Sequence, residues 1–122
     1  MAENREYLSA AQKGGVIHIS EEVIVSIAAM AVMEVEGVYG VGPNPAPDLT
    51  DRLSKRGLGK SIRLAFEEES VTIACDVTLL FGYSVIEVAK KIQEQVTTAV
   101  ASMTGCKVQG VDVNVCGITL PK

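Results

Sequence analysis

The side chains with the most reactive chemistry in this chain of 122 residues are three cysteines and a single histidine. A cysteine nucleophile needs an accessible thiolate and a neighbouring base. Cys75 falls among the inward-facing positions of an alternating apolar run, which indicates a buried structural thiol. Cys116 falls on the outward side of a later run and has no histidine near it in the sequence. We therefore expect neither cysteine to be a catalytic residue.

The same residues offer little to a metal ion or to a disulfide framework. The chain has no CxxC pair, and His18 is its only histidine, so the familiar Cys/His spacing of a zinc site is missing. Cys75, Cys106 and Cys116 make an odd number, which disfavours a disulfide framework. His18 lies on the polar side of a short strand, with no GxSxG elbow elsewhere to partner it. The sequence predicts no catalytic residue, no metal site and no cofactor.

Two further motifs only resemble catalytic or binding sites. Glu67, Glu68 and Glu69 are consecutive acids at a predicted hairpin turn, where we expect them to be solvated rather than held apart in a dry pocket. The segment 57–60, Gly-Leu-Gly-Lys, lacks the length of a phosphate-binding loop and precedes a strand instead of opening a helix. Neither motif therefore indicates acid–base catalysis or nucleotide binding.

Basic residues are unevenly distributed along the chain. Five of the eleven lysines and arginines gather within twelve positions: Arg52, Lys55, Arg56, Lys60 and Arg63. They form either a solvated loop or a contact for an anion, such as an acidic lipid head group or an acidic partner. The net charge of −4 and the scarcity of flanking aromatic residues disfavour nucleic acid. The cluster is the candidate anion or partner contact.

The elements that must position these residues can be predicted from periodicity and caps. A helix is expected over Glu21–Glu36, with Ser20 as its N-cap and Gly37 as its stop. A second helix begins at the capping box of Ser84 and Glu87 and ends at Gly105. Strands are predicted at Val16–Ile19, Val38–Val41, Ser61–Glu67, Val71–Phe81 and Val111–Cys116.

This β-α-β-β-α-β order predicts a single small α+β domain: a mainly antiparallel sheet with two helices packed on one face. Residues 1–13 are expected to be a flexible N-terminal tail, and residues 14–120 the domain, with a Pro-rich and basic loop at 42–60. The first fifteen residues lack the pattern of a secretory signal, so a cytoplasmic location is expected. The longest apolar run, Ile27–Met33, is far shorter than the roughly 18–20 residues of a membrane span.

Several segments together, in their order and spacing, resemble one known family. They are Gly15–Ser20, Ile27–Ala29, Glu34–Val38, Val85–Ala89 and Val111–Val115. The chain resembles the alkaline shock protein family, envelope stress response proteins of Gram-positive bacteria, over residues 14–118. Each segment alone is a generic cap or apolar stripe, and their combination is what is specific.

This resemblance implies a non-enzymatic protein of cell-envelope homeostasis or stress response. It implies protein–protein contacts near the inner face of the membrane, with a partner such as a small membrane-anchored protein, and self-association into a homo-oligomer. Candidate contact surfaces are the basic cluster and an exposed sheet edge. The alternative is a small RNA- or DNA-binding α+β domain that uses the basic loop 52–63.

Overall fold

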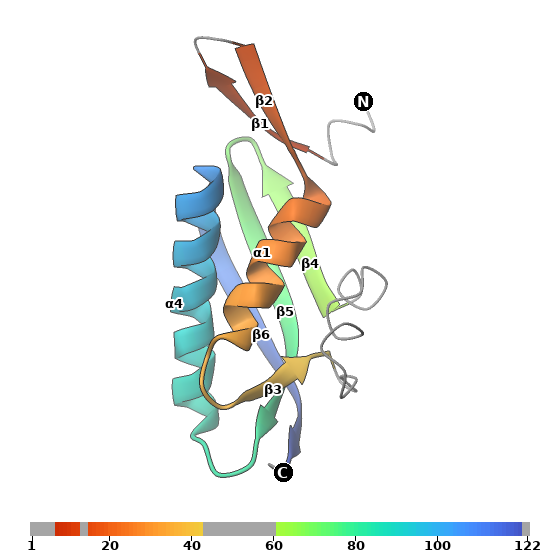
Figure 1. The fold of residues 1–122 in the computed structure, drawn as a ribbon, viewed down its shortest axis with the longest axis vertical. Coiled ribbons are helices and arrows are strands. Elements are labelled where there is room, and N and C mark those ends of the chain that lie inside the picture. The colour runs from red at the N-terminus through yellow and green to blue at the C-terminus, as the bar shows by residue number, and fades with distance from the viewer. Residues whose placement is uncertain (1–6, 13–14, 43–60, 121–122) are drawn as a thin grey trace.

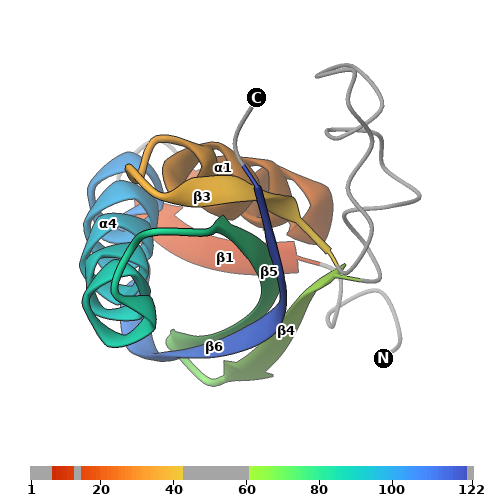
Figure 2. The ribbon, with the colours of Figure 1, turned by 90° about the horizontal axis from the view of Figure 1, so that it is seen from below.

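The computed structural model of the protein describes residues 7–12, 15–42 and 61–120. In these ranges it contains six strands and two helices. Their bounds are β1 Tyr7–Gln12, β2 Gly15–Ser20, α1 Glu21–Met33, β3 Val38–Val41, β4 Ile62–Glu67, β5 Ser70–Leu80, α4 Val85–Thr104 and β6 Lys107–Thr119. The predicted α+β class is confirmed: α1 and α4 pack together and on one face of the sheet (Figures 1 and 2).

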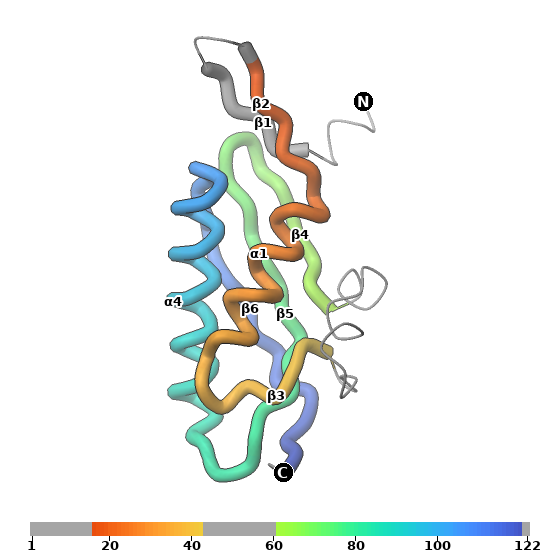
Figure 3. Tube along the Cα trace, in the orientation of Figure 1, coloured from red at the N-terminus to blue at the C-terminus, as the bar shows by residue number. Residues whose placement is uncertain are grey.

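The sheet is organised around β5. On one edge of β5, β4 pairs antiparallel with residues 70–75 and β3 pairs antiparallel with residues 77–79. On the other edge, β6 pairs with β5 in parallel along residues 70–80. A parallel neighbour requires a crossover, and α4 provides it (Figure 3). The last strand is longer than predicted, because it follows β5 over the whole of that strand.

The core lies between the sheet and the two helices. Alternate residues of β5 point inward and are fully buried: Val71, Ile73, Cys75, Val77 and Leu79. From α4, the buried residues recur every four positions: Val88, Ile92, Val96 and Val100. This is the alternating and helical spacing that the sequence predicts. The aliphatic side chains of the sheet and the helices therefore form one continuous core.

The ends of the helices agree with the sequence only in part. Ser20 is the N-cap of α1 by its extended backbone, but its side chain makes no capping hydrogen bond. Ser84 does cap α4, since its side chain accepts a hydrogen bond from the Glu87 amide at 3.4 Å. The first helix ends at Met33 rather than at Glu36, because the chain needs a turn before β3.

The strand β1 was not predicted, and it falls within the range 1–13 expected to be a tail. It pairs antiparallel with β2, from Tyr7 opposite Ser20 to Gln12 opposite Gly15. This hairpin extends from the end of the domain where α1 begins (Figure 1). The Pro-rich and basic loop expected at 42–60 lies outside the described residues except for Gly42.

Candidate interaction surfaces

The structure describes one member of the basic cluster. Arg52, Lys55, Arg56 and Lys60 lie outside the described residues, so the contact expected there stays a prediction. Arg63 lies on β4, on the face of the sheet that α1 and α4 do not cover.

Arg63 belongs to a polar network that crosses three strands. Its two terminal nitrogens donate to the two carboxylate oxygens of Asp76 on β5, at 3.0 and 3.1 Å. The side-chain amide of Asn114 on β6 donates to Asp76 Oδ1 at 3.0 Å. The Arg63 hydrogen bonds, aided by Asn114, hold the pKa of the Asp76 carboxyl below its usual range. An anion would therefore have to compete with Asp76 for this guanidinium.

Cys75 and Cys116 lie on the buried and the exposed side that the sequence predicts. Cys75 is fully buried, and burial raises the pKa of its thiol to about 12. Burial also raises the pKa of the Cys106 thiol. Cys116 is exposed on β6, and all three cysteines are free. His18 is exposed on β2. The structure thus does not bring His18 and the two buried thiols into one accessible site.

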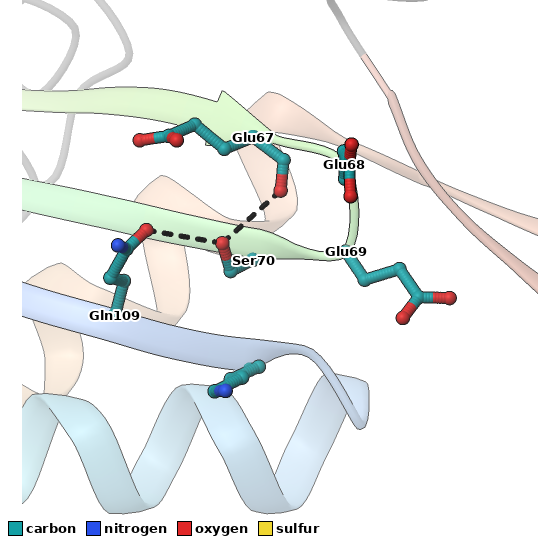
Figure 4. Close-up of a pocket in the computed structure, with 6 residues that line it drawn as sticks. Glu67, Glu68, Glu69, Ser70 and Gln109 are labelled. Atoms are coloured by element: carbon teal, nitrogen blue, oxygen red, sulfur yellow. Dashed lines mark hydrogen bonds between the residues drawn. The ribbon is translucent and has the colours of Figure 1, made fainter.

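The three consecutive acids line an open hollow at the β4–β5 turn. Its volume is about 490 Å³, and its lining is Glu67, Glu68, Glu69, Ser70, Lys107 and Gln109. The Ser70 hydroxyl donates to the Glu67 carbonyl at 3.1 Å and to the Gln109 amide oxygen at 3.2 Å. Figure 4 shows the carboxylates of Glu67 and Glu69 pointing away from each other. The acids are exposed, as predicted for a solvated turn. In the described parts of the chain, no three acids, cysteines or histidines cluster closely enough to hold a metal ion.

The described sheet has exposed edges on both sides: the outer edges of β3 and β4 on one side, and the outer edge of β6 on the other. The edge of β6 is the longest of these, because β6 runs along the whole of β5. Among the described strands, β6 has β5 on one side and no strand on the other. Register shifts relative to β5 place extra residues at Gln109 and Cys116. Between these two bulges, residues 110–115 pair regularly with β5. Such an edge offers backbone N–H and C=O groups to another strand. One of them is already in use, since the Val111 carbonyl accepts a hydrogen bond from the Gln93 side-chain amide of α4 at 2.9 Å and has only its second lone pair left for a partner.

A second candidate surface is apolar, and the periodicity of the sequence does not predict it. The turn from β5 into α4 and the end of β6 lie at the same end of the molecule (Figure 1). In these segments six large apolar side chains are exposed. We call this set the apolar end: Phe81, Tyr83, Val85, Ile86, Ile118 and Leu120. The Phe81 amide donates to the Thr119 carbonyl at 2.7 Å, which fixes the turn against the end of β6. The apolar run on both sides of Gly82 was the available signal.

An acidic pocket lies beside the apolar end, between the exit of α1 and the middle of α4. We use this name for an open pocket of about 230 Å³ lined by Glu34, Val35, Glu36, Lys91, Glu94 and Gln95. The Gln95 amide donates to Glu34 at 3.3 Å and so connects the two helices. The Tyr83 hydroxyl donates to Glu36 at 3.4 Å, which joins the apolar end to the acidic pocket.

Comparison with known proteins places the chain among relatives of similar length. It is 30% identical over 104 residues to the uncharacterized protein YqhY of Bacillus subtilis, covering 85% of this chain and 77% of that one. It is 31% identical to YloU of the same organism, covering 87% and 90%, and 35% identical to Spy1535 of Streptococcus pyogenes, covering 88% and 82%.

A solved structure titled MamM CTD is 17% identical with a TM-score of 0.49, covering 79% of this chain and 93% of that one. None of the described helices combines the length and apolar content needed to cross a bilayer. The model of the alkaline shock protein 23 family, described as having a cell envelope-related function, matches residues 9–120. The chain therefore belongs to the alkaline shock protein 23 family, whose function is related to the cell envelope.

Proposed function

We propose that this protein is a non-enzymatic interaction protein of cell-envelope homeostasis or stress response, which works through protein contacts near the inner face of the membrane. Family membership supports the link to the envelope. The open outer edge of β6 is the observation that carries the protein contact. The partner that this edge fits best is a second copy of the same strand, related by a two-fold axis.

The sequence of β6 restricts the register of such a pair. Residues directly opposite each other in an antiparallel pair share a face, so valines must meet valines. A two-fold axis at Val113 satisfies this condition and places Val111 opposite the partner's Val115. The same axis places Asp112 opposite the partner's Asn114, whereas an axis at Asp112 would oppose two carboxylates. An axis at Asn114 would also pair valines, but it would leave Val111 without a valine opposite and Asp112 opposite the partner's Cys116. The pair is therefore expected to centre on Val113.

Asn114 can take part in this contact although its side chain already donates a hydrogen bond to Asp76. A side-chain amide carries two N–H groups, and only one is needed for the 3.0 Å hydrogen bond to Asp76. The second N–H group is expected to donate to the carboxylate of Asp112 in the second copy. Residues 110–115 span roughly 20 Å at about 3.3 Å per residue, which is the usual length of a strand.

A matched pair of variants tests this register. Asn114→Asp places a carboxylate opposite the partner's Asp112 and should weaken self-association. The double variant Asp112→Asn with Asn114→Asp exchanges the two roles and should restore it. Two cross-strand pairs at roughly 0.2–1 kcal/mol each predict a change of about 2- to 30-fold in the dimer dissociation constant. Both variants carry the same change beside Asp76, so they differ from each other only at residue 112.

Sedimentation velocity over a range of concentrations measures the effect. A full chain that stays monomeric at every concentration would contradict the pairing. So would equal association of the single and the double variant.

The membrane part of the proposal needs a separate test. We expect the protein to sediment with native membranes, to be lost from membranes treated with protease, and to crosslink there to a membrane protein. Purified protein that bound neutral vesicles directly, regardless of salt, would contradict a partner-mediated location.

The alternative function, nucleic-acid binding through the loop 52–63, predicts a different result. It requires a gel shift at physiological salt that weakens when Arg52, Lys55 and Arg56 become Ala. Under the proposed function the purified chain gives no such shift.

A further inference from the structure

The apolar end is built from three separate parts of the chain, and its side chains are unusually exposed. Phe81 lies in the β5–α4 turn, Ile86 in the first turn of α4 and Leu120 just after β6. Their exposed fractions are 63%, 64% and 70%. Single exposed apolar residues are ordinary, but six gathered at one end of a small domain mark an interaction site.

The backbone under the apolar end is held in place by hydrogen bonds on both sides. The Phe81 amide is bound to the Thr119 carbonyl at 2.7 Å, and Ser84 caps α4. Tyr83 lies against Gly37, where a Cβ atom would come within 3.0 Å of the aromatic ring. The surface is therefore organised before any partner arrives, which lowers the entropic cost of binding.

The charges beside the apolar end are negative on balance. The acidic pocket contributes three carboxylates and one ammonium group, and on α4 the exposed Glu87 adds a fourth carboxylate and the exposed Lys90 a second ammonium group. The Tyr83–Glu36 hydrogen bond makes this charge continuous with the apolar end. An anionic lipid surface would be repelled here, because the inner leaflet carries negative charge.

We infer that the apolar end and the acidic pocket together bind an amphipathic helix whose apolar face is bordered by lysine or arginine. The apolar side chains take the apolar face of such a helix, and the carboxylates of Glu34, Glu36 and Glu94 take its basic border. Membrane proteins present basic segments of this kind just inside the membrane. The inference rests on the proposed function in that it names the chemistry of the membrane partner, and it assigns that partner to a surface other than the edge of β6.

A defined probe tests the inference without any membrane. A synthetic peptide of about 18 leucines and lysines in amphipathic order forms a helix roughly 27 Å long. The full chain should bind it by calorimetry and should bind the matching leucine–glutamate peptide at least about tenfold more weakly. Phe81→Ser combined with Ile86→Ser should weaken binding about tenfold or more.

Two controls locate the binding site. Met103→Ser removes an equally exposed side chain, at 69%, from the opposite end of α4 and should leave the affinity unchanged. Glu34→Gln with Glu36→Gln should weaken binding and flatten its dependence on salt. All of the substituted side chains are exposed, so the variants should melt at the temperature of the unsubstituted chain.

Four results of the peptide and self-association measurements would overturn the inference. They are absence of binding, equal binding of the two peptides, an equal loss with Met103→Ser, and self-association that disappears with the Phe81 and Ile86 substitutions. Direct binding of the chain to vesicles of anionic lipid through Phe81 and Ile86 would overturn it in favour of a lipid surface. Failure of the β6 pairing or of membrane recovery would leave peptide binding intact, so the two proposals fail separately.

Discussion

Side chains that alternate along β5 meet two different environments. Those that point toward α1 and α4, such as Ile73 and Cys75, are fully buried among aliphatic residues. Those on the other face, such as Thr72 and Asp76, stay in partial contact with solvent. The covered face holds the fold together, and the open face can change with little loss of stability. Substitutions at neighbouring positions of β5 can therefore distinguish residues that stabilise the fold from residues that determine the chemistry of the open face.

Thiol labelling gives the largest expected difference between the two faces. In the native chain Cys116 should react at once, and Cys75 should react only on unfolding. A thiol with a pKa of about 12 carries on the order of a thousandfold less thiolate at neutral pH than a free cysteine. Mass spectrometry after timed labelling measures this, with Cys116→Ser as the control that removes the fast reaction. Equal rates for Cys75 and Cys116 would mean that the covered face opens readily.

Adjacent substitutions on β5 test the same comparison by stability. Ile73→Ala should lower the free energy of unfolding by about 2–5 kcal/mol, because it leaves a cavity beneath the helices. Thr72→Ala, one residue away on the open face, should change it by no more than about 0.5 kcal/mol. Urea unfolding monitored by circular dichroism measures both. A similar loss from the two variants would contradict the assignment of the faces.

A comparison of two glycines distinguishes the cost of steric crowding from the cost of backbone strain. Gly37 and Gly82 have φ values of +101° and +106°, so alanine is strained at either position by about 1–3 kcal/mol. Only at Gly37 would a Cβ atom also meet a neighbour, at 2.9 Å from Val88 Cγ2. Gly37→Ala should therefore cost about 1–3 kcal/mol more than Gly82→Ala in the same urea experiment. Equal losses would show that the chain relaxes around Gly37.

The Asp76 network should give the smallest effect, and one that depends on pH. Its carboxyl has a lowered pKa in the folded chain, chiefly through the hydrogen bonds from Arg63. The stability it contributes is therefore present above the unfolded-state value of about 3.9 and is lost as the pH falls through the folded value. Asp76→Asn should destabilise the chain at pH 7 by less than either glycine substitution, because the pair is partly exposed.

Urea unfolding at a series of pH values measures this contribution. The difference in the free energy of unfolding between the unsubstituted chain and Asp76→Asn should disappear in acid. Glu69→Gln, which removes one exposed carboxylate at the β4–β5 turn, is the control for the loss of one negative charge. A difference that widened as the pH fell would contradict the role of the carboxylate.

The sequence predicts the covered face better than the surfaces. Apolar residues alternate from Val71 to Leu79 and recur every four positions from Val88 to Val100. This periodicity arises because one side of each element is buried, so it can be read from the local sequence. The left-handed stop at Gly105 was predictable for the same reason, since few residues other than glycine adopt its φ of +73°.

Features that depend on distant partners were predicted poorly. Tyr7–Gln12 is rich in serine and alanine, which have weak strand propensity, and it becomes β1 only through its pairing with β2. Val85 fits the apolar stripe of α4 but lies before the helix reaches the core, so it remains exposed. The pairing of Arg63 with Asp76 follows from the register of β4 on β5, which a single strand pattern does not contain.

The parallel position of β6 has a consequence for how the chain folds during synthesis. The β4–β5 hairpin closes over a short stretch of sequence and can form early, whereas β6 reaches β5 only after α4 has been made. One edge of β5 therefore stays uncovered on the ribosome until Lys107 and the residues after it emerge. In that interval a neighbouring nascent chain can take the place of β6. Copies made on one polysome can thus exchange their last strands, and a chaperone that shields β5 would prevent it.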